Sequence, residues 1–246
     1  MADRRNSSSV TAPRHGVARV ISKLGMGSRT QAGHWVRAGR VQVNGRMVRD
    51  AEFPVVQGLD RIAVDGRPLQ ASGRMVVMLN KPRGLVTTAS DEQGRATVYS
   101  CFAGASLPWL APVGRLDKAS EGLLLFSNDP AWAARINEPK SAPDKTYHVQ
   151  IDQLLAVSQL RDIQQGAVVA GERLTAKSVR ILRSGDQHSW LEIVVNEGRN
   201  RQIRRLLSAF EISVLRLVRV AVGPLPLGDL PKGKWRQLTA MEIDSL

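Results

Sequence analysis

The chain has 246 residues, of which 43% are hydrophobic, and a formal net charge of +13. This length and apolar content fit one or two globular domains with a sizeable core, and they exclude a wholly disordered chain. The charge predicts a polyanionic partner, and nucleic acid is favoured over a membrane surface because the sequence has neither a long basic amphipathic helix nor an apolar run of about 20 residues.

The first residues of the sequence indicate whether this segment is ordered and where in the cell the protein is located. Residues 1–15 contain arginines and small polar residues but no apolar segment of the kind found in secretory signals. We therefore expect a disordered basic tail and a cytoplasmic protein. Cys101 is the single cysteine, so an internal disulfide is excluded, and no spacing of cysteines and histidines indicates a metal site.

Residues 16–70 are predicted to form a small domain of two helices followed by hairpins. Apolar residues at 17, 20, 21 and 24 recur at helical spacing up to Gly25, which can end a helix in the left-handed conformation. Ser28 and Gln31 form a capping box for a second helix that closes at Gly39. The pairs Asn44-Gly45 and Asp65-Gly66 are strong signals for hairpin turns.

This domain resembles the alpha-L RNA-binding domain shared by a small-subunit ribosomal protein and tyrosyl-tRNA synthetases. The resemblance is carried by Ser28-Arg29, Gly39-Arg40-Val41, Val43-Asn44-Gly45 and Val64-Asp65-Gly66. It implies a basic surface that faces RNA phosphates. The residues expected there are Lys23, Arg29, Arg37 and Arg40. A solvated, charged helix face is the alternative interpretation of the same residues.

Residues 71–73 read as a linker, and residues 74–246 as a second, larger domain. The apolar run from 75 to 79 predicts a strand that ends at Asn80-Lys81-Pro82. Lys81 is a candidate for an RNA phosphate contact, although a charged residue at the end of a strand is commonly only solvated.

Asp117 lies in a polar stretch between Gly114 and Gly122, and the apolar run Leu123 to Phe126 after it predicts a buried strand. Loops carried on rigid strands are where catalytic groups concentrate, but an aspartate at a turn is more often only a turn-former. The residues alone leave both interpretations open. Asp129-Pro130 then predicts the cap and first position of a helix.

Basic residues dominate the last third of the chain. An alternating strand starting at Lys145 places Lys145 and Tyr147 on one face. A further strand covers 189–195, a turn opens a helix that continues through Leu207, and an alternating strand follows over 214–220. Six arginines and two glutamates fall between residues 197 and 220. We expect such a density of positive charge to be repulsive without an anionic partner.

Four motifs of this domain, in the same order, resemble those of pseudouridine synthases of the RsuA type. The motifs are Asn80-Lys81-Pro82, the stretch Gly114-Arg115-Leu116-Asp117 with Ser120-Glu121-Gly122-Leu123-Leu124, Lys145 with Tyr147, and Gln202-Ile203-Arg204. The resemblance implies an α+β fold, in which the small helix-helix-hairpin domain is followed by a catalytic domain built on a mixed, largely antiparallel sheet with a central cleft.

The resemblance also implies a reaction that needs neither metal nor organic cofactor. Uracil is detached from its ribose, turned and rejoined through carbon, with Asp117 as nucleophile or as the base acting on ribose. Tyr147 would stack on the base, and Arg204 would pair with Asp117, with Arg201 or Arg205 as the next candidate for that role. The further RNA contacts expected are Arg115, Lys145, Arg199, Arg201 and Arg205.

The expected substrate is a uridine of ribosomal RNA, with the large subunit favoured over the small, and the expected protein is a monomer. The alternative is a non-catalytic factor of ribosome assembly that binds ribosomal RNA. Asp117, Tyr147 and Arg204 argue against that alternative, because a protein that only binds RNA has no need of an aspartate among arginines that face phosphate.

Overall fold

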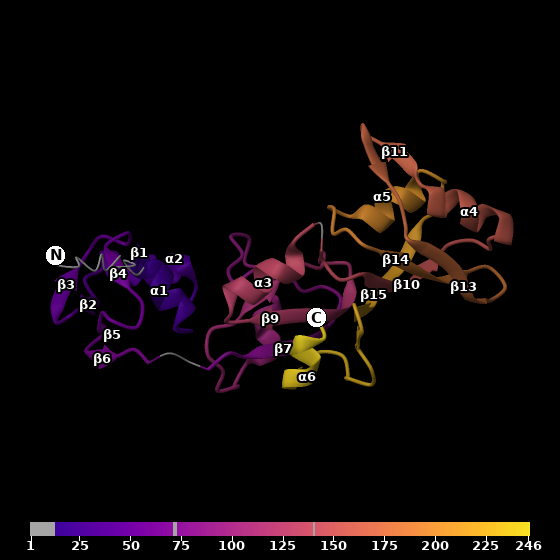
Figure 1. The fold of residues 1–246 in the computed structure, drawn as a ribbon. Helices are drawn as coiled ribbons and strands as arrows, with labels where there is room; N and C mark the ends of the chain where they lie inside the picture. The colour runs from indigo at the N-terminus through magenta and orange to yellow at the C-terminus, as the bar shows by residue number, and fades with distance from the viewer. Residues whose placement is uncertain (1–12, 71–72, 140) are drawn as a thin grey trace, which may run out of the picture. The chain divides into compact units, whose positions relative to one another are not determined.

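The computed structural model describes residues 13–70, 73–139 and 141–246, and the chain divides into two compact units between Gly73 and Arg74 (Figure 1). Most of the predicted tail and linker, residues 1–12 and 71–72, lies outside the described residues. Arg14 belongs to β1 (Arg14–Gly16), which pairs with β4 (Pro54–Val56). The prediction of disorder up to residue 15 is therefore wrong for its last residues, because their backbone finds a partner strand.

The first unit contains the two predicted helices and hairpins. Helices α1 (Val17–Lys23) and α2 (Arg29–Arg37) pack on a sheet with the strand order β3-β2-β5-β6. The Ser28 hydroxyl accepts a hydrogen bond of 3.1 Å from the Gln31 N–H, which caps α2 as predicted. Positive φ angles of 51° at Asn44 and 81° at Gly45 form the predicted turn. The strands are β2 (Val41–Val43), β3 (Arg46–Val48), β5 (Ile62–Val64) and β6 (Arg67–Pro68).

The second unit is built on a mixed sheet with the strand order β13-β14-β10-β15-β9-β7-β17. Within this sheet β15 and β9 pair in parallel, and the other pairs are antiparallel, so the predicted topology is confirmed. Its strands are β7 (Val76–Lys81), β9 (Glu121–Ser127), β10 (Lys145–Ile151), β13 (Ser178–Ser184), β14 (Ser189–Val195), β15 (Val214–Val222) and β17 (Trp235–Gln237), with β8 (Ala111–Val113) beside β9 and β16 (Leu225–Pro226) beside β15.

One half of this sheet, formed by β7 and β9, is covered on both faces. On one face Val76 and Leu123 pack against α3 (Pro130–Asn137) and α6 (Ala240–Asp244). On the other face Leu79 and Leu124 pack with the 3-10 helix η1 (Val98–Phe102). All residues of β9 are buried, which explains why its sequence is a continuous apolar run rather than an alternating one.

The other half, formed by β13, β14, β10 and β15, is covered on one face. Figure 1 shows α4 (Val157–Gln165), α5 (Gln202–Ser208) and β11 (Ala167–Val169) on the same side of these strands. With β12 (Glu172–Leu174), they bury the alternate residues Leu191 and Ile193 completely, whereas Trp190 and Glu192, which point to the other face, stay partly exposed. Buried and partly exposed residues alternate strictly along β14, as expected for a sheet with one open face.

Gly122 joins the two halves. It pairs with Arg219 across the parallel contact between β9 and β15, at a φ of 99°. A Cβ atom at this position would lie 2.2 Å from the Arg219 carbonyl oxygen, so only glycine allows the two strands to approach. The loop that precedes β9 is thereby held beside β15.

Among the described residues, no helix combines the length and the apolar composition that crossing a membrane requires.

Candidate active site

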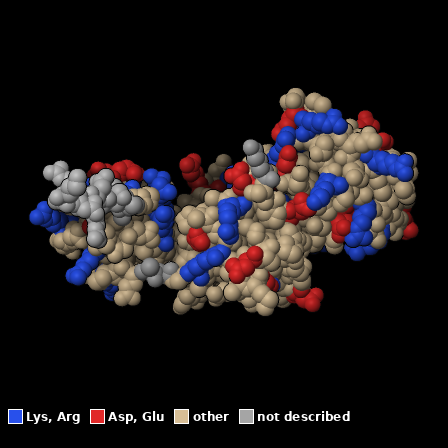
Figure 2. Space-filling view, viewed as in Figure 1, with Lys and Arg blue, Asp and Glu red and all other residues tan. Residues whose placement is uncertain are grey.

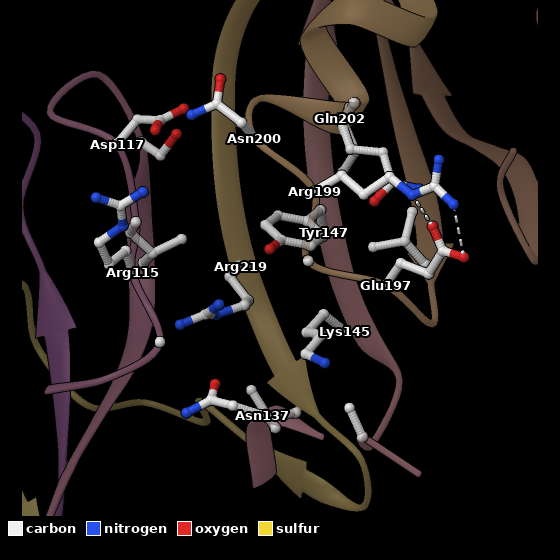
Figure 3. A pocket seen from close by; sticks show the side chains of 18 of the residues that line it. Arg115, Asp117, Asn137, Lys145, Tyr147, Glu197, Arg199, Asn200, Gln202 and Arg219 are labelled. Carbon is white, nitrogen blue, oxygen red and sulfur yellow. Dashed lines mark hydrogen bonds and ion pairs between the residues drawn. The ribbon is translucent and has the colours of Figure 1, made fainter. Parts of the chain in front are cut away.

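A cavity of about 610 Å³ opens in the second unit where the two sheet halves meet (Figure 3). This volume lies within the range of about 300–1,000 Å³ that is usual for small-ligand sites. One wall is the loop of residues 114–120, called the Asp117 loop here, and the opposite wall is the loop of residues 196–201, called the Arg201 loop. Of the predicted site residues, the cavity brings together Arg115, Asp117, Lys145, Tyr147, Arg199 and Arg201.

Asp117 projects into this cavity with 36% of its side chain exposed. Its loop is fixed by backbone contacts on both sides of the aspartate. The Thr87 hydroxyl donates to the Leu116 carbonyl at 2.7 Å, and the Ser120 N–H donates to the Asp117 carbonyl at 3.0 Å. The carboxylate is thus held at a set position while its oxygens stay accessible.

Lys81 lies beneath the Asp117 loop and is fully buried. Its ammonium donates to the carbonyl oxygens of Asp117 at 3.1 Å, Ser120 at 2.8 Å and Pro82 at 3.2 Å. Burial lowers the pKa of Lys81 to about 8, although nearby Asp117 and Glu121 oppose that shift. The prediction that Lys81 contacts RNA phosphate is therefore wrong, because all three N–H donors are used inside the protein.

Arg204 does not make the predicted ion pair with Asp117 in the structure. Its guanidinium donates to the Val214 carbonyl at 3.0 Å and to the Ala119 carbonyl at 3.4 Å. The residue is partly buried, and this burial, together with the charge of Arg201, lowers the pKa of the Arg204 guanidinium. Arg204 therefore ties the Asp117 loop to the end of β15 through the backbone of Ala119.

Arg201 is the arginine that faces the aspartate. Its Nη1 lies 3.8 Å from Oδ2 of Asp117, which is the ion pair between the two walls. Arg201 adopts a left-handed backbone conformation, with φ at 49°, directly before α5. A non-glycine residue in this conformation costs about 1 kcal/mol or more, and such positions cluster at functional sites.

The floor of the cavity comes from β10 and β15. Lys145 and Tyr147 both line it, as the predicted alternation requires, and Arg219 lies directly opposite Tyr147 on β15. Arg219 is 6% exposed, and its Nε donates to the Leu123 carbonyl at 2.7 Å. Burial and, second, the charge of Arg219 lower the pKa of Lys145. Figure 3 shows Arg219 extending from β15 toward the side on which Arg115 and Asp117 lie.

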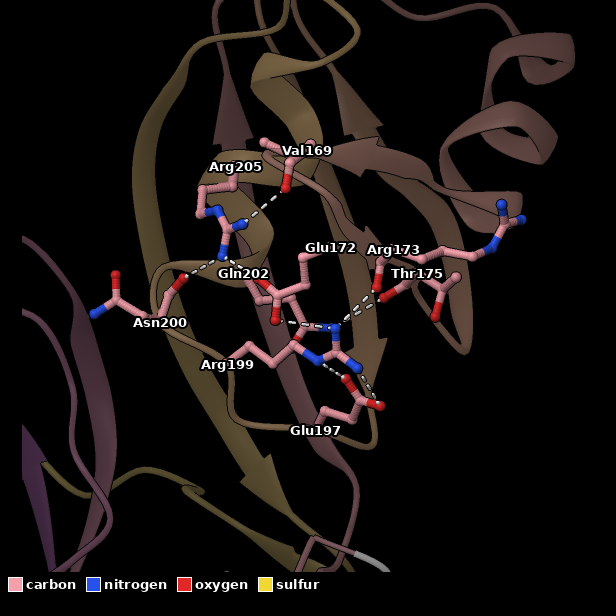
Figure 4. A network of polar contacts seen from close by, with 9 residues as sticks. All are labelled: Val169, Glu172, Arg173, Thr175, Glu197, Arg199, Asn200, Gln202 and Arg205. Carbon is pink, nitrogen blue, oxygen red and sulfur yellow. Dashed lines mark hydrogen bonds and ion pairs between the residues drawn. The ribbon is translucent and has the colours of Figure 1, made fainter.

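The Arg201 loop is anchored by ion pairs to the hairpin of β11 and β12 (Figure 4). Arg199 contacts Glu172 at 3.0 Å and also pairs with Glu197. Arg205 contacts the second oxygen of Glu172 at 2.7 Å and donates to the Val169 carbonyl at 3.2 Å. The hydrogen bond from Arg205 and the charge of Arg199 lower the pKa of Glu172.

This network corrects one expectation about the arginines between 197 and 220. They do not need an external anion to offset their repulsion, because carboxylates from distant parts of the chain pair with several of them. Glu172 forms ion pairs with Arg199 and Arg205, and Glu121 forms an ion pair with Arg216 at 2.8 Å. The RNA contact predicted for Arg205 is not favoured, since Arg205 does not line the cavity.

The basic residues predicted in the first unit differ in their surroundings. Arg29 pairs with Glu52 at 3.1 Å, and Arg40 makes a two-pronged contact with Asp65 at 2.9 and 2.5 Å. Lys23 and Arg37 make no ion pair with any described residue. All four remain at the surface of their unit, and their contact with RNA stays a prediction.

Groups of histidine, cysteine and carboxylate residues that could hold a metal ion are absent among the residues described by the structure. The cavity's polar groups are instead the carboxylates of Asp117 and Glu197, several cations, a tyrosine, a serine and amides. This set suits the binding of a neutral planar group and phosphate oxygens.

Residues 75–209 match the family model described as RNA pseudouridylate synthase, and residues 17–60 match that of the S4 domain. The chain belongs to the RNA pseudouridylate synthase family. This confirms the resemblance seen in the four motifs and the resemblance of the first domain.

Relatives of this synthase match it over nearly its whole length. An uncharacterized RNA pseudouridine synthase of Aquifex aeolicus (strain VF5) is 34% identical over 94% of this chain and 92% of that protein. The ribosomal large subunit pseudouridine synthase B of Bacillus subtilis (strain 168) is 34% identical over 93% of each protein. A crystal structure of a pseudouridylate synthase, 28% identical, matches with a TM-score of 0.65 over 94% of this chain and 99% of that one. The predicted α+β fold is therefore confirmed.

Sequence reasoning did not select several polar residues that line the synthase's cavity, among them Arg219, Asn200 and Asn137. Arg219 could have been found, because it lies three residues after Arg216 on one strand and must face the other side of the sheet. Asn200 points toward Asp117 from the Arg201 loop (Figure 3). Asn137 comes from the end of α3, and no sequence pattern links that helix to the cavity.

Proposed function

We propose that this synthase converts a uridine of large-subunit ribosomal RNA to pseudouridine, with Asp117 as the reacting carboxylate. The observation that carries the assignment is the position of Asp117: a partly exposed carboxylate on a rigid loop, 3.8 Å from Arg201, at the rim of a cavity with Tyr147 and Arg219 in its floor. Relatives that match nearly the whole chain are named ribosomal large subunit pseudouridine synthase B, which supports the choice of ribosomal RNA.

The proposed reaction is an isomerisation within one nucleotide. The bond from N1 of uracil to C1′ of ribose breaks, the base turns, a bond from C5 to C1′ forms, and the proton on C5 leaves while N1 gains one. Asp117 acts on the ribose, either as a nucleophile at C1′ or as a base, and both routes begin from the same carboxylate. No step consumes an oxidant or a second substrate.

The cavity's other groups have distinct tasks in this proposal. A uridine must leave the RNA stack to reach Asp117, and an aromatic ring such as that of Tyr147 can then stack on the base. Arg115, Lys145 and Arg219 lie where they can contact the phosphates and base oxygens of the extruded nucleotide. Arg204 is a positioning residue here, since it reaches the aspartate only through the Ala119 carbonyl.

The first unit supplies RNA affinity outside the cavity in this scheme. Lys23 and Arg37 are the groups best suited to phosphate, because neither is engaged by a described carboxylate, whereas Arg29 and Arg40 must first leave Glu52 and Asp65. Each phosphate contact made by such residues steepens the salt dependence of binding.

The test separates chemistry from binding. Asp117→Asn keeps the size of the side chain but removes its charge and nucleophilicity, so we expect release of tritium from RNA labelled at uracil C5 to stop, while a filter-binding curve on the same RNA stays unchanged. The matched control is Lys118→Met, which changes an exposed neighbour on the same loop. Substantial turnover by Asp117→Asn would remove this residue from the reaction.

A further inference from the structure

The open face of the half formed by β13, β14, β10 and β15 lies opposite the cavity. Alternation along the strands sends Tyr147, Leu217 and Val195 toward the cavity side and the residues between them to the other side. None of these intervening residues is buried. The open face, called the Trp190 face here, presents His148, Gln150, Arg180, Trp190, Glu192 and Arg216.

Trp190 stands near the middle of this face between two guanidinium groups. Arg183 is its direct partner on β13, with the guanidinium carbon 4.9 Å from the centroid of the ring. Arg216 lies on the other side, beyond Gln150 in the strand order, at 5.8 Å from the same centroid. The three planar groups form a short row across the strands.

The charges on and beside this face leave an excess of cations. Arg180 and His148 share a single carboxylate, Glu192, at 2.6 and 3.6 Å. Arg216 and Lys232 share Glu121, whose side chain is only 4% exposed. Arg183 contacts the indole ring and makes no ion pair with any carboxylate in the described part of the chain.

Basic side chains gather over the part of the second unit that β13 and β14 form, as Figure 2 shows. An open four-stranded face with a central aromatic ring, flanking arginines and excess positive charge has the chemistry of a surface that binds unpaired RNA. Bases stack on aromatic rings and guanidinium planes, and cations hold the phosphates between them.

We propose that the Trp190 face binds a single-stranded segment of RNA, separate from the nucleotide that enters the cavity. One base stacks on the row formed by Trp190 and Arg183, and Arg183 and Arg180 contact the adjoining phosphates. A duplex fits less well, because stacking on a protruding ring requires an unpaired base. The proposal goes beyond the proposed function, and it holds whether or not Asp117 performs the chemistry.

The experiment measures binding of a fluorescein-labelled oligouridine of about 12 nucleotides, long enough to span one such surface. We expect Trp190→Leu to weaken binding at least about fivefold, because stacking on an aromatic ring has an effect of that size or larger. Arg183→Ala should make the slope of log K against log salt less steep by about 0.7, the value for one phosphate on a single strand. The control Arg161→Ala changes an exposed arginine on α4, which packs on the opposite face, and should bind like the parent.

A second measurement places the oligonucleotide on the surface. An oligouridine containing 4-thiouridine should crosslink to the segment from Arg183 to Trp190 in the full-length protein, and the Asp117→Asn variant should give the same crosslink. Circular dichroism checks the fold of each variant. If Trp190→Leu does not fold, Arg183→Glu at an exposed position provides the same test with a larger expected loss of affinity.

The proposal is overturned if Trp190→Leu and Arg183→Ala bind the oligouridine with the affinity and salt slope of Arg161→Ala. Crosslinks confined to the cavity and the first unit would have the same meaning. A change from dimer to monomer in Trp190→Leu, with RNA binding unaltered, would assign this face to a second copy of the chain instead.

Discussion

The two walls of the cavity hold their polar groups by different means. The Asp117 loop is fixed from beneath by Lys81, which has no exposed surface and donates to three backbone carbonyls. The Arg201 loop is fixed by ion pairs of Glu172 with Arg199 and Arg205, all of them partly exposed. Buried hydrogen bonds to a charged group contribute more to a fixed geometry than ion pairs that solvent screens.

This difference matches the tasks that we propose for the walls. A carboxylate that reacts with ribose must be placed closely, since errors of about 1 Å at a reacting centre can cost roughly 100-fold in rate. A wall that admits and releases an RNA nucleotide must move, and segments held by exposed contacts open at lower free energy than buried ones. Substitutions that weaken one wall at a time test this difference.

The largest effect is expected for Lys81→Met, which keeps the length of the side chain but leaves the Asp117 and Ser120 carbonyls without their buried donor. We expect the single-turnover rate at saturating RNA to fall roughly 100-fold and the free energy of unfolding to fall by about 1–3 kcal/mol. Urea unfolding and tritium release measure the two quantities. Lys118→Met, on the same loop but exposed, is the control, and a rate for Lys81→Met equal to that of this control would show that the wall does not depend on Lys81.

A change of pH tests the same wall without a substitution. Since the pKa of Lys81 is about 8 in the folded protein and 10.5 ordinarily, only about one tenth of the molecules keep the ammonium at about pH 9. The neutral amine has one donor fewer, so we expect the rate at saturating RNA to fall up to about tenfold between pH 7 and 9.

Rising pH is expected to lower the rate but to raise the contribution of Lys81 to the free energy of unfolding. The two effects can therefore be told apart. Between pH 8 and 10.5 the unfolded chain binds the Lys81 proton more tightly than the folded protein does, so this residue's contribution to stability rises with pH there. Lys145→Gln tests the other lysine at the cavity whose pKa is lowered. If the alkaline decrease in rate disappears in Lys145→Gln and persists in Lys81→Met, Lys145 rather than Lys81 causes it.

A smaller effect is expected at the other wall. Glu172→Gln keeps the shape of the side chain but removes the charge that pairs with Arg199 and Arg205. We expect the single-turnover rate to fall by about fivefold, because the Arg201 loop is then held less firmly. Raising the salt concentration should reduce the rate of the parent toward that of the variant, because the ion pairs are screened. Glu211→Gln, an exposed acid after α5, is the control. A loss as large as that of Lys81→Met would contradict the difference between the walls.

The smallest effect is expected for an exposed ion pair far from the cavity in sequence. Arg40→Lys keeps the charge opposite Asp65 but loses the two-pronged contact. We expect the midpoint of urea unfolding to stay close to that of the parent, because an exposed ion pair contributes little to stability, and the single-turnover rate to stay unchanged. A clear loss of rate at saturating RNA would mean that the first unit takes part in the chemical step.

The helices, the strands and the Asp117 loop were predictable because the sequence patterns that mark them span only a few residues. Ser28 with Gln31, Asn44-Gly45 and Asp129-Pro130 each fix a helix start or a turn within a few residues, and the structure has all three. The continuous apolar run of β9 and the alternation of β14 also follow from how many faces of the sheet are covered.

The contacts that hold the site were not predictable, because they join residues far apart in the chain. Nothing near Lys81 indicates that its ammonium is enclosed by carbonyls 36 and 39 residues away. The role of Arg204 was predicted from a motif, but its bonds go to the Val214 and Ala119 carbonyls, which only the packing of α5 against β15 and the Asp117 loop determines. No sequence pattern predicted the ion pairs of Glu172, since a glutamate in a hairpin is usually solvated.

Mapping pseudouridines in cells tests whether Asp117 performs an isomerisation in large-subunit ribosomal RNA. Pseudouridines are mapped across total RNA from cells that lack this protein and from the same cells supplied with the parent or with Asp117→Asn. We expect that one position in large-subunit ribosomal RNA is a uridine without the protein, is converted by the parent, and stays unconverted with Asp117→Asn present at equal abundance. Conversion at that position by Asp117→Asn, or a map that is identical in all three strains, would contradict it.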